Sequence, residues 1–123
     1  MKALLLVAHG SRRTQSNDEI EALAASLREQ SAEFDLIDHA FLELVEPSIE
    51  QGFQKLVDLG AQHITVMPYF LSAGNHVIKD VPKIVKAFAQ QHPKLTIAVA
   101  PHFGSAPGVA ELMLSLANNA KTP

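Results

Sequence analysis

The stretch that decides the fold is ALLLVAHGSRR, residues 3–13. Residues 3–8 are apolar without interruption, which is typical of a strand covered on both faces in a parallel sheet. The polar residues that follow, with Gly10 among them, indicate a loop directly after the strand. We therefore expect a buried parallel strand that presents His9 at its carboxyl end.

Three more apolar runs follow along the chain, at residues 36–44, 63–71 and 95–100. Between these runs, and after the last one, apolar residues recur at helical spacing in four sets. Each set predicts the inward face of a helix. The four sets are Ile20, Leu23, Ala24 and Leu27; Ile49, Phe53, Leu56 and Val57; Val81, Ile84, Val85 and Phe88; and Leu112, Leu116 and Ala117. The alternation predicts one α/β domain over residues 1–123, with an open, mostly parallel four-stranded sheet and helices on both faces.

Local signals predict where the helices begin and end. Ser16 and Glu19 have the spacing of a capping box for the first helix. Pro47 suits the first turn of the second helix, and Gly60 suits its carboxyl end. Pro107 is expected to begin the last helix.

Composition excludes several classes of function. The net charge of −3 argues against a general nucleic-acid binder. The sequence has no cysteine, which excludes disulfides, thiolate zinc sites, iron–sulfur clusters and cysteine nucleophiles. The amino-terminal apolar run is too short for a signal peptide or a membrane span, so we expect a cytoplasmic protein without a membrane partner.

Each predicted strand leads to an imidazole or a carboxylate. His9 follows the first strand, Glu43 and Glu46 lie near the end of the second, His76 follows the third through a loop, and His102 follows the fourth. Open α/β sheets bind ligands beyond the carboxyl ends of their strands, near the point where the strand order reverses. With the order 2-1-3-4, that point lies between the first and third strands. The remaining histidines, His39, His63 and His92, are assigned to local structure. Local hydrogen bonds are expected for His39 and His63.

Phosphate chemistry is disfavoured by the motifs. The sequence contains neither GxxxxGK[ST] nor GxGxxG. AHGSR is similar to the RHG of histidine phosphatases, but Ala8 stands where the phosphate-holding arginine belongs. A phosphoryl transfer through a phosphohistidine at His9 is therefore the weakest of the readings that we consider.

Three segments together carry a specific resemblance. They are VAHGSR at 7–12, FLELVEPSI at 41–49 and MPYFLSAGNHVIKDVP at 67–82. In this order, over roughly residues 1–110, the chain resembles the small class II chelatases, the cobalt- and iron-inserting sirohydrochlorin chelatases of cobalamin and siroheme synthesis. The resemblance implies a flavodoxin-like half-unit, and a homodimer whose cleft lies between the subunits.

The resemblance also implies roles for residues. His9 and His76 bind the metal and act in chelation, and Glu43 matches the acidic residue of the second strand. Val45 and the loop after the third strand fall where the family contacts the tetrapyrrole, although Asn75 stands where a basic residue is frequent. His102 matches no motif of the family. The loop residues are Ser72, Ala73, Gly74 and Asn75.

The chemistry of these side chains agrees with metal insertion. Neutral imidazoles suit Co²⁺, Fe²⁺ and Ni²⁺, and a site with two histidines holds an ion loosely enough to release it. The metal is then a substrate, and no prosthetic group is expected. Arg12 and Arg13 follow His9 directly and suit the carboxylates of a tetrapyrrole. A non-catalytic carrier of metal or tetrapyrrole uses the same histidine pair and stays open as the alternative.

Overall fold

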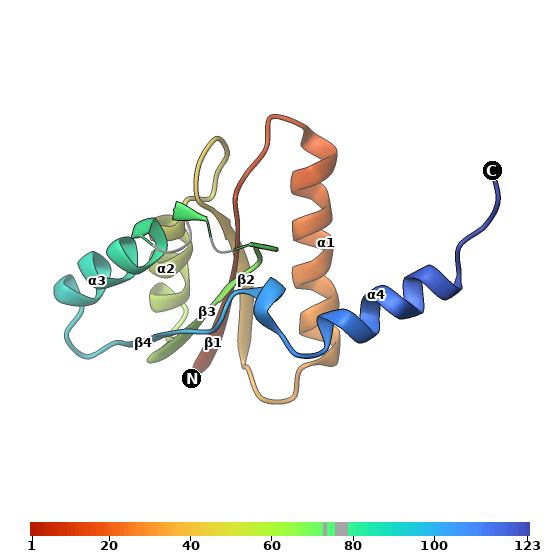
Figure 1. The fold of residues 1–123 in the computed structure, drawn as a ribbon. Helices are drawn as coiled ribbons and strands as arrows, with labels where there is room; N and C mark the ends of the chain where they lie inside the picture. Colours follow the sequence, from red (N-terminus) through yellow and green to blue (C-terminus); the bar gives the residue numbers. More distant parts are fainter. Residues whose placement is uncertain (73, 76–78) are drawn as a thin grey trace.

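A single parallel sheet organises the molecule (Figure 1). The computed structural model describes residues 1–72, 74–75 and 79–123. The strand order is β2-β1-β3-β4, which is the order assumed in placing the ligand-binding edge, and all neighbours are parallel. The strands are β1 (Lys2–Ala8), β2 (Leu36–Phe41), β3 (His63–Pro68) and β4 (Thr96–Val99).

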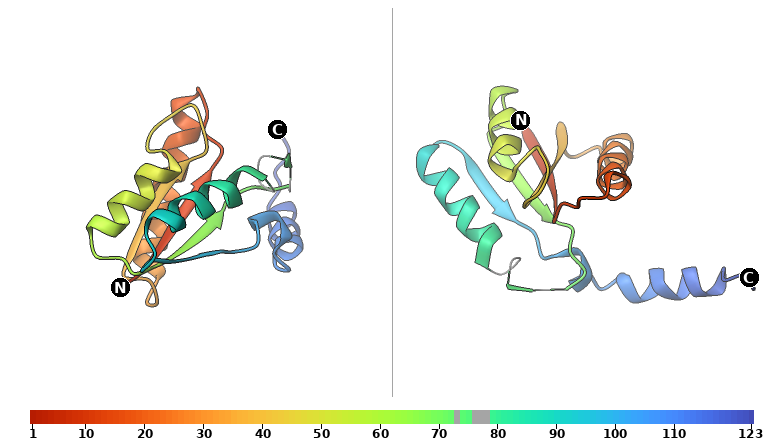
Figure 2. Two further views of the ribbon diagram at one scale, coloured as in Figure 1. Left: turned by 90° about the vertical axis from the view of Figure 1, so that its left-hand side faces the viewer. Right: turned by 90° about the horizontal axis from the view of Figure 1, so that it is seen from above.

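One helix covers one face of the sheet and two helices cover the other. In Figure 2, α1 lies on one side of the strands and α2 and α3 lie on the other. The elements are α1 (Thr14–Gln30), α2 (Ile49–Asp58), α3 (Val81–Gln91), the 3-10 helix η2 (Phe103–Ser105) and α4 (Val109–Asn118). Among the described residues, no helix is long and apolar enough to cross a membrane.

Two apolar clusters hold the layers together. The larger lies under α2 and α3, where the rings of Phe53 and Phe88 are 5.0 Å apart. Full burial of one such side chain contributes about 1.5–3 kcal/mol. The smaller cluster lies under α1 and joins Leu6, Ala8, Ile20, Ala24 and Phe41. The apolar spacing thus predicts the inward faces of α1, α2 and α3 correctly.

The predicted start of the first helix is wrong. The helix begins at Thr14, and its N-cap residue Arg13 makes no side-chain capping bond. Ser16 lies inside the first turn, where its amide donates to the Arg13 carbonyl at 3.1 Å. The helix starts earlier because Asn17 holds the preceding loop, as described below.

The limits of the other elements are closer to the predictions. A capping box of Ser48 and Gln51 begins α2, so Pro47 lies just before the helix and not in its first turn. Gly60 follows α2 with φ +103°, as expected. The second, third and fourth strands are shorter than their apolar runs: residues 42–44, 69–71, 95 and 100 lie outside the bounds of β2, β3 and β4.

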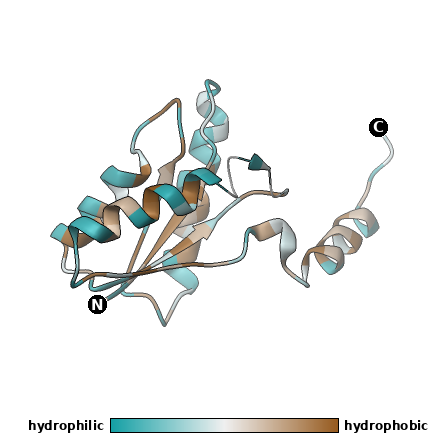
Figure 3. Ribbon diagram, turned by 60° about the vertical axis from the view of Figure 1, so that its left-hand side comes forward, coloured by the Kyte–Doolittle hydropathy of each residue, from teal (hydrophilic) through white to brown (hydrophobic). Residues whose placement is uncertain are grey.

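The last helix does not face inward, which overturns the prediction for Leu112, Leu116 and Ala117. None of the residues of α4 is buried, and Leu112 and Leu116 are 56% and 73% exposed. The helix extends away from the sheet on the side of α1 (Figures 1 and 2). Most residues of α4 are hydrophobic (Figure 3). The spacing identifies an apolar face but does not indicate what covers it.

α4 begins at Val109, with Gly108 rather than Pro107 before it.

Candidate functional site

His9 and Glu43 meet at the carboxyl edge of the sheet. β1 and β2 pair in register up to Ala8 and Phe41. The ladder continues beyond them, since the amide of Leu42 donates to the Ala8 carbonyl at 2.9 Å and that of Glu43 to the His9 carbonyl at 3.0 Å. His9 Nε2 then lies 3.5 Å from Glu43 Oε1. The two side chains are 52% and 46% exposed, so the pair forms an open rim.

Gly10 permits this close approach of the two loops. It has φ +98°, a conformation that favours glycine. A Cβ atom placed there would lie 2.0 Å from the carbonyl oxygen of Glu43. Any other residue would therefore push the Glu43 loop away from His9.

Asn17 fixes the loop that carries Arg12 and Arg13. Its side-chain oxygen accepts from the Ser11 amide at 3.0 Å, and its side-chain nitrogen donates to the Ser11 carbonyl at 2.8 Å. The Ser11 hydroxyl accepts from the Arg13 amide at 3.0 Å. The two arginines are exposed beside His9, where they can meet an anionic ligand. Sequence reasoning missed Asn17, although an asparagine near a helix start is a known backbone-binding signal.

The loop after β2 folds back on the strand. Leu44 has φ +74°, and the amide of Phe41 donates to the Pro47 carbonyl at 2.8 Å. Val45 is half-buried against the apolar cluster under α1. The structure thus places Val45 in the same loop as Glu43, with part of its side chain used in packing.

The loop after β3 is supported by the segment after β4. Phe70 accepts at its carbonyl from the Gly104 amide at 2.9 Å, and the rings of Tyr69 and Phe103 are 5.5 Å apart. A Cβ atom at Gly104 would lie 1.7 Å from the Leu71 carbonyl oxygen. Phe70 packs against the large core, whereas Leu71 is exposed.

The predicted tetrapyrrole-binding loop is described only in part. Ser72, Gly74 and Asn75 are exposed. Ala73 and His76 lie outside the described residues, so the predicted convergence of His9 with His76 stays a prediction. Among the residues that are described, no three His, Asp or Glu side chains are grouped closely enough to hold a metal ion.

The other histidines have local roles, with one exception to the prediction. His92 ends α3, and its Nδ1 lies 3.1 Å from the Phe88 carbonyl. His63 is exposed at the start of β3. The carbonyl of His102 accepts from the amide and the hydroxyl of Ser105, which turns the chain toward α4. His39 differs from expectation, because its buried Nδ1 lies 3.4 Å from Asp38 Oδ1 but makes no hydrogen bond within the described part of the chain.

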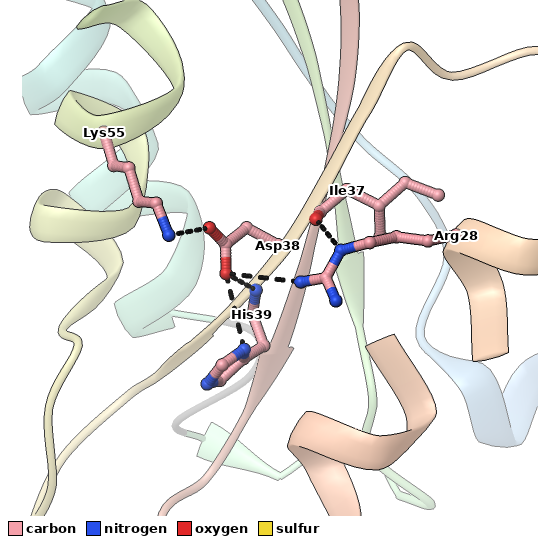
Figure 4. Close-up of polar contacts among 5 residues, drawn as sticks. All are labelled: Arg28, Ile37, Asp38, His39 and Lys55. Atoms are coloured by element: carbon pink, nitrogen blue, oxygen red, sulfur yellow. Dashed lines mark hydrogen bonds and ion pairs between the residues drawn. The ribbon is translucent and has the colours of Figure 1, made fainter. Parts of the chain in front are cut away.

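A second polar cluster surrounds Asp38 (Figure 4). Asp38 is 7% exposed on β2, with Lys55 Nζ at 2.7 Å and Arg28 at 3.9 Å from its carboxylate. Burial raises the pKa of Asp38, but the hydrogen bonds from Lys55 and from the His39 amide outweigh it and hold the pKa below its usual value. Arg28 also donates from Nε to the Ile37 carbonyl at 2.8 Å. This cluster ties α1 and α2 to β2, away from the carboxyl edge.

The chain matches a known protein family over nearly its whole length. The model of the CbiX family matches residues 3–120. The chain belongs to the CbiX family. A sirohydrochlorin cobaltochelatase of Methanococcus maripaludis is 38% identical over 85 residues, which are 69% of this chain and 58% of that protein. The chain thus matches less than two thirds of that relative.

Other relatives match nearly the whole chain. A sirohydrochlorin cobaltochelatase of Sulfolobus acidocaldarius is 31% identical over 120 residues, which are 98% of this chain and 93% of that protein. The crystal structure of the sirohydrochlorin chelatase SirB from Bacillus subtilis subspecies spizizenii, in complex with cobalt, superposes with a TM-score of 0.86 at 30% identity. That match covers 96% of this chain and 50% of the SirB chain.

Proposed function

We propose that this protein is a chelatase that inserts Co²⁺ or Fe²⁺ into sirohydrochlorin or a related polycarboxylated tetrapyrrole, in cobalamin or siroheme biosynthesis. The observation that carries the proposal is the pair of His9 and Glu43, 3.5 Å apart on the open carboxyl edge of a CbiX-family sheet. The cobalt complex of SirB and the chelatase names of the relatives support it.

Metal insertion makes three demands on the protein. The ion must exchange water for protein ligands, the macrocycle must be held, and two pyrrole N–H protons must leave. His9 and His76 are the proposed ligands, since neutral imidazole binds first-row divalent ions and can release them. Glu43 lies within reach of the His9 ring and is the proposed proton acceptor or relay.

The carboxylates of the substrate need cationic or amide partners. Arg12 and Arg13 are exposed directly after His9 and are proposed to bind them. The proposed contacts to the macrocycle are Val45, Ser72, Ala73, Gly74 and Asn75. Because the chain has a net charge of −3, attraction of an anionic substrate must be local to this edge.

The test uses three variants, His9→Ala, His76→Ala and Glu43→Gln. Absorbance during incubation of sirohydrochlorin with Co²⁺, and with Fe²⁺ under anaerobic conditions, reports insertion. We expect each histidine variant to lose at least tenfold in rate with an unchanged melting temperature, and Glu43→Gln to lose rate while it still binds metal. His63→Ala, at the opposite end of the sheet, is the matched control and should keep the wild-type rate.

The same assay separates an enzyme from a carrier. An enzyme produces many equivalents of metallated product per chain, whereas a carrier stops near one equivalent. Wild-type rates in both histidine variants, or no acceleration over the uncatalysed reaction, would contradict the proposal.

A further inference from the structure

Leu44 is the centre of a strained three-residue turn in the loop after β2. The Val45 amide donates to the Glu43 carbonyl at 2.9 Å, and Leu44 between them has φ +74°. A turn of this kind with a positive central φ is rare and strained. Among the described residues, Leu44 is the one non-glycine with a positive φ, since Gly10 and Gly60 occupy the other such positions. This turn therefore persists against a backbone preference that a glycine would not have.

The chain on both sides of Leu44 holds the turn in place. Before it, the Glu43 amide donates to the His9 carbonyl at 3.0 Å, which ties the loop to the end of β1. After it, Val45 packs against the apolar cluster under α1. Strained conformations persist where the surroundings determine them in this way, and they are frequent at ligand sites.

The turn itself does not require a leucine. A glycine would adopt the same backbone conformation at no steric cost, and a polar side chain would suit contact with water. Leu44 is instead 56% exposed, so the fold keeps a large apolar surface in water directly beside Glu43. Backbone strain and an exposed apolar side chain thus coincide at one position, and the fold gains little packing from either. We expect such a side chain to serve a ligand.

Exposed apolar side chains lie on both sides of His9 at the carboxyl edge. β1 lies between β2 and β3, so the His9 loop separates the Leu44 turn from the segment after β3. In that segment Tyr69 and Leu71 are exposed, and the Tyr69 amide donates to the Val7 carbonyl at 2.7 Å. Ligand sites commonly combine apolar walls with a few polar groups that fix orientation. A ring system with apolar faces and a carboxylated rim matches this arrangement.

We propose that Leu44 is a substrate-contact residue whose side chain packs against one face of the tetrapyrrole beside Glu43. The proposal rests on the proposed function and deepens it, because it names a group that orients the ring toward His9 and Glu43. The strained turn fixes the side chain before the ligand arrives, which lowers the ordering cost of binding.

The first test measures the affinity for metal-free sirohydrochlorin by its fluorescence, together with KM and kcat for insertion of Co²⁺. Leu44→Ala removes most of the side chain, so we expect Kd and KM for the tetrapyrrole to rise about tenfold with little change in kcat. Leu44→Met keeps the apolar bulk and should stay within about twofold of wild type. Leu59→Ala is the matched control, because Leu59 is an equally exposed leucine that follows α2 at the opposite end of the sheet. It should leave both constants unchanged.

Leu44→Gly separates the side chain from the backbone. It removes the same contact but relieves the strain, so its Kd should rise as in Leu44→Ala while its melting temperature exceeds that of Leu44→Ala. Wild-type Kd and KM in the alanine and glycine variants would overturn the proposal, and so would an equal loss of affinity in Leu44→Met. A loss in Leu44→Gly alone would assign the role to backbone rigidity and overturn the contact. A glycine variant that melts no higher than the alanine variant would overturn the strained turn on which the proposal depends.

The binding and insertion measurements separate this proposal from the proposed function. A wild type that binds sirohydrochlorin without inserting metal contradicts the proposed function, and the Leu44 contact then stands if the variants lose affinity. Insertion by Leu44→Ala at an unchanged KM contradicts the contact and leaves the proposed function standing. A wild type that binds no sirohydrochlorin overturns both.

Discussion

At the scale of single residues, the carboxyl edge depends on how closely two backbones approach. Gly10 lets the His9 loop pass the Glu43 carbonyl, and Asn17 holds Ser11 from both sides. Neither residue is a candidate for binding metal. Their part is to keep His9 and Glu43 3.5 Å apart.

Gly10→Ala should damage both stability and insertion. The new Cβ would lie 2.0 Å from the Glu43 carbonyl oxygen, and φ +98° is unfavourable for alanine. We expect a loss of about 2–4 kcal/mol in the free energy of unfolding, together with a lower insertion rate. Chemical denaturation and the absorbance assay measure the two effects.

Gly60→Ala is the matched control for this prediction. Gly60 has φ +103°, but an added Cβ would meet only the Met1 sulfur at 3.4 Å. It should lose about 1–2 kcal/mol from backbone strain and keep the wild-type insertion rate. Equal effects of the two substitutions would mean that the approach to Glu43 is unimportant.

Asp38 should make the fold sensitive to acid. Its pKa is lower in the folded protein than in the unfolded chain, so the unfolded chain takes up the proton more readily. The stabilisation is therefore complete above the usual aspartate value, near pH 4, and is lost as the pH falls through the folded-state pKa. Asp38→Asn should cost about 1–3 kcal/mol at pH 7 and less at an acidic pH below about 4.

Urea unfolding at both pH values checks the predicted sensitivity to acid. It is measured on wild type, Asp38→Asn and Lys55→Met. Lys55→Met removes the partner at 2.7 Å, so it should also flatten the dependence on acid. A difference between wild type and Asp38→Asn that stays constant down to pH 2 would disprove the role given to the ion pair.

At the scale of elements, the periodic patterns predict the sheet and three helices well. The unbroken apolar run of β1 and the four-residue spacing in α2 follow directly from burial. The convergence of His9 and Glu43 was also predictable, because parallel neighbours end at one edge. The start of α1 was not, since it depends on hydrogen bonds from Asn17 to a loop six residues earlier. The orientation of α4 was not either, because spacing alone does not specify the covering surface.

The contact between η2 and the loop after β3 should influence how the tetrapyrrole binds. Gly104→Ala would place a Cβ 1.7 Å from the Leu71 carbonyl oxygen, so one of the two segments must move. Since Ser72 and the following residues continue from Leu71, we expect a raised KM for the tetrapyrrole and a stability loss of about 1–3 kcal/mol. Gly108→Ala, where an added Cβ meets nothing within 4 Å, is the control and should stay within about 1 kcal/mol of wild type. An unchanged KM in Gly104→Ala would show that η2 does not support the loop.

At the scale of the whole molecule, the homodimer that the family resemblance implies would link folding to association. An unfolding reaction that also separates two chains is opposed by higher protein concentration. Each tenfold increase adds about 1.4 kcal/mol per dimer, or several degrees in the melting temperature. Differential scanning calorimetry over a hundredfold range should show this rise in wild type. The absence of this rise in wild type would contradict the homodimer.

The bond from Arg28 Nε to the Ile37 carbonyl also matters for the folded protein at high concentration. β2 is an outer strand of the sheet, and outer strands are templates for fibril growth. A guanidinium already bound to this strand, next to a buried carboxylate, makes it a poor surface for an incoming strand. Lateral polymerisation of the sheet into aggregates is therefore expected to be more favourable at β4, the other outer strand.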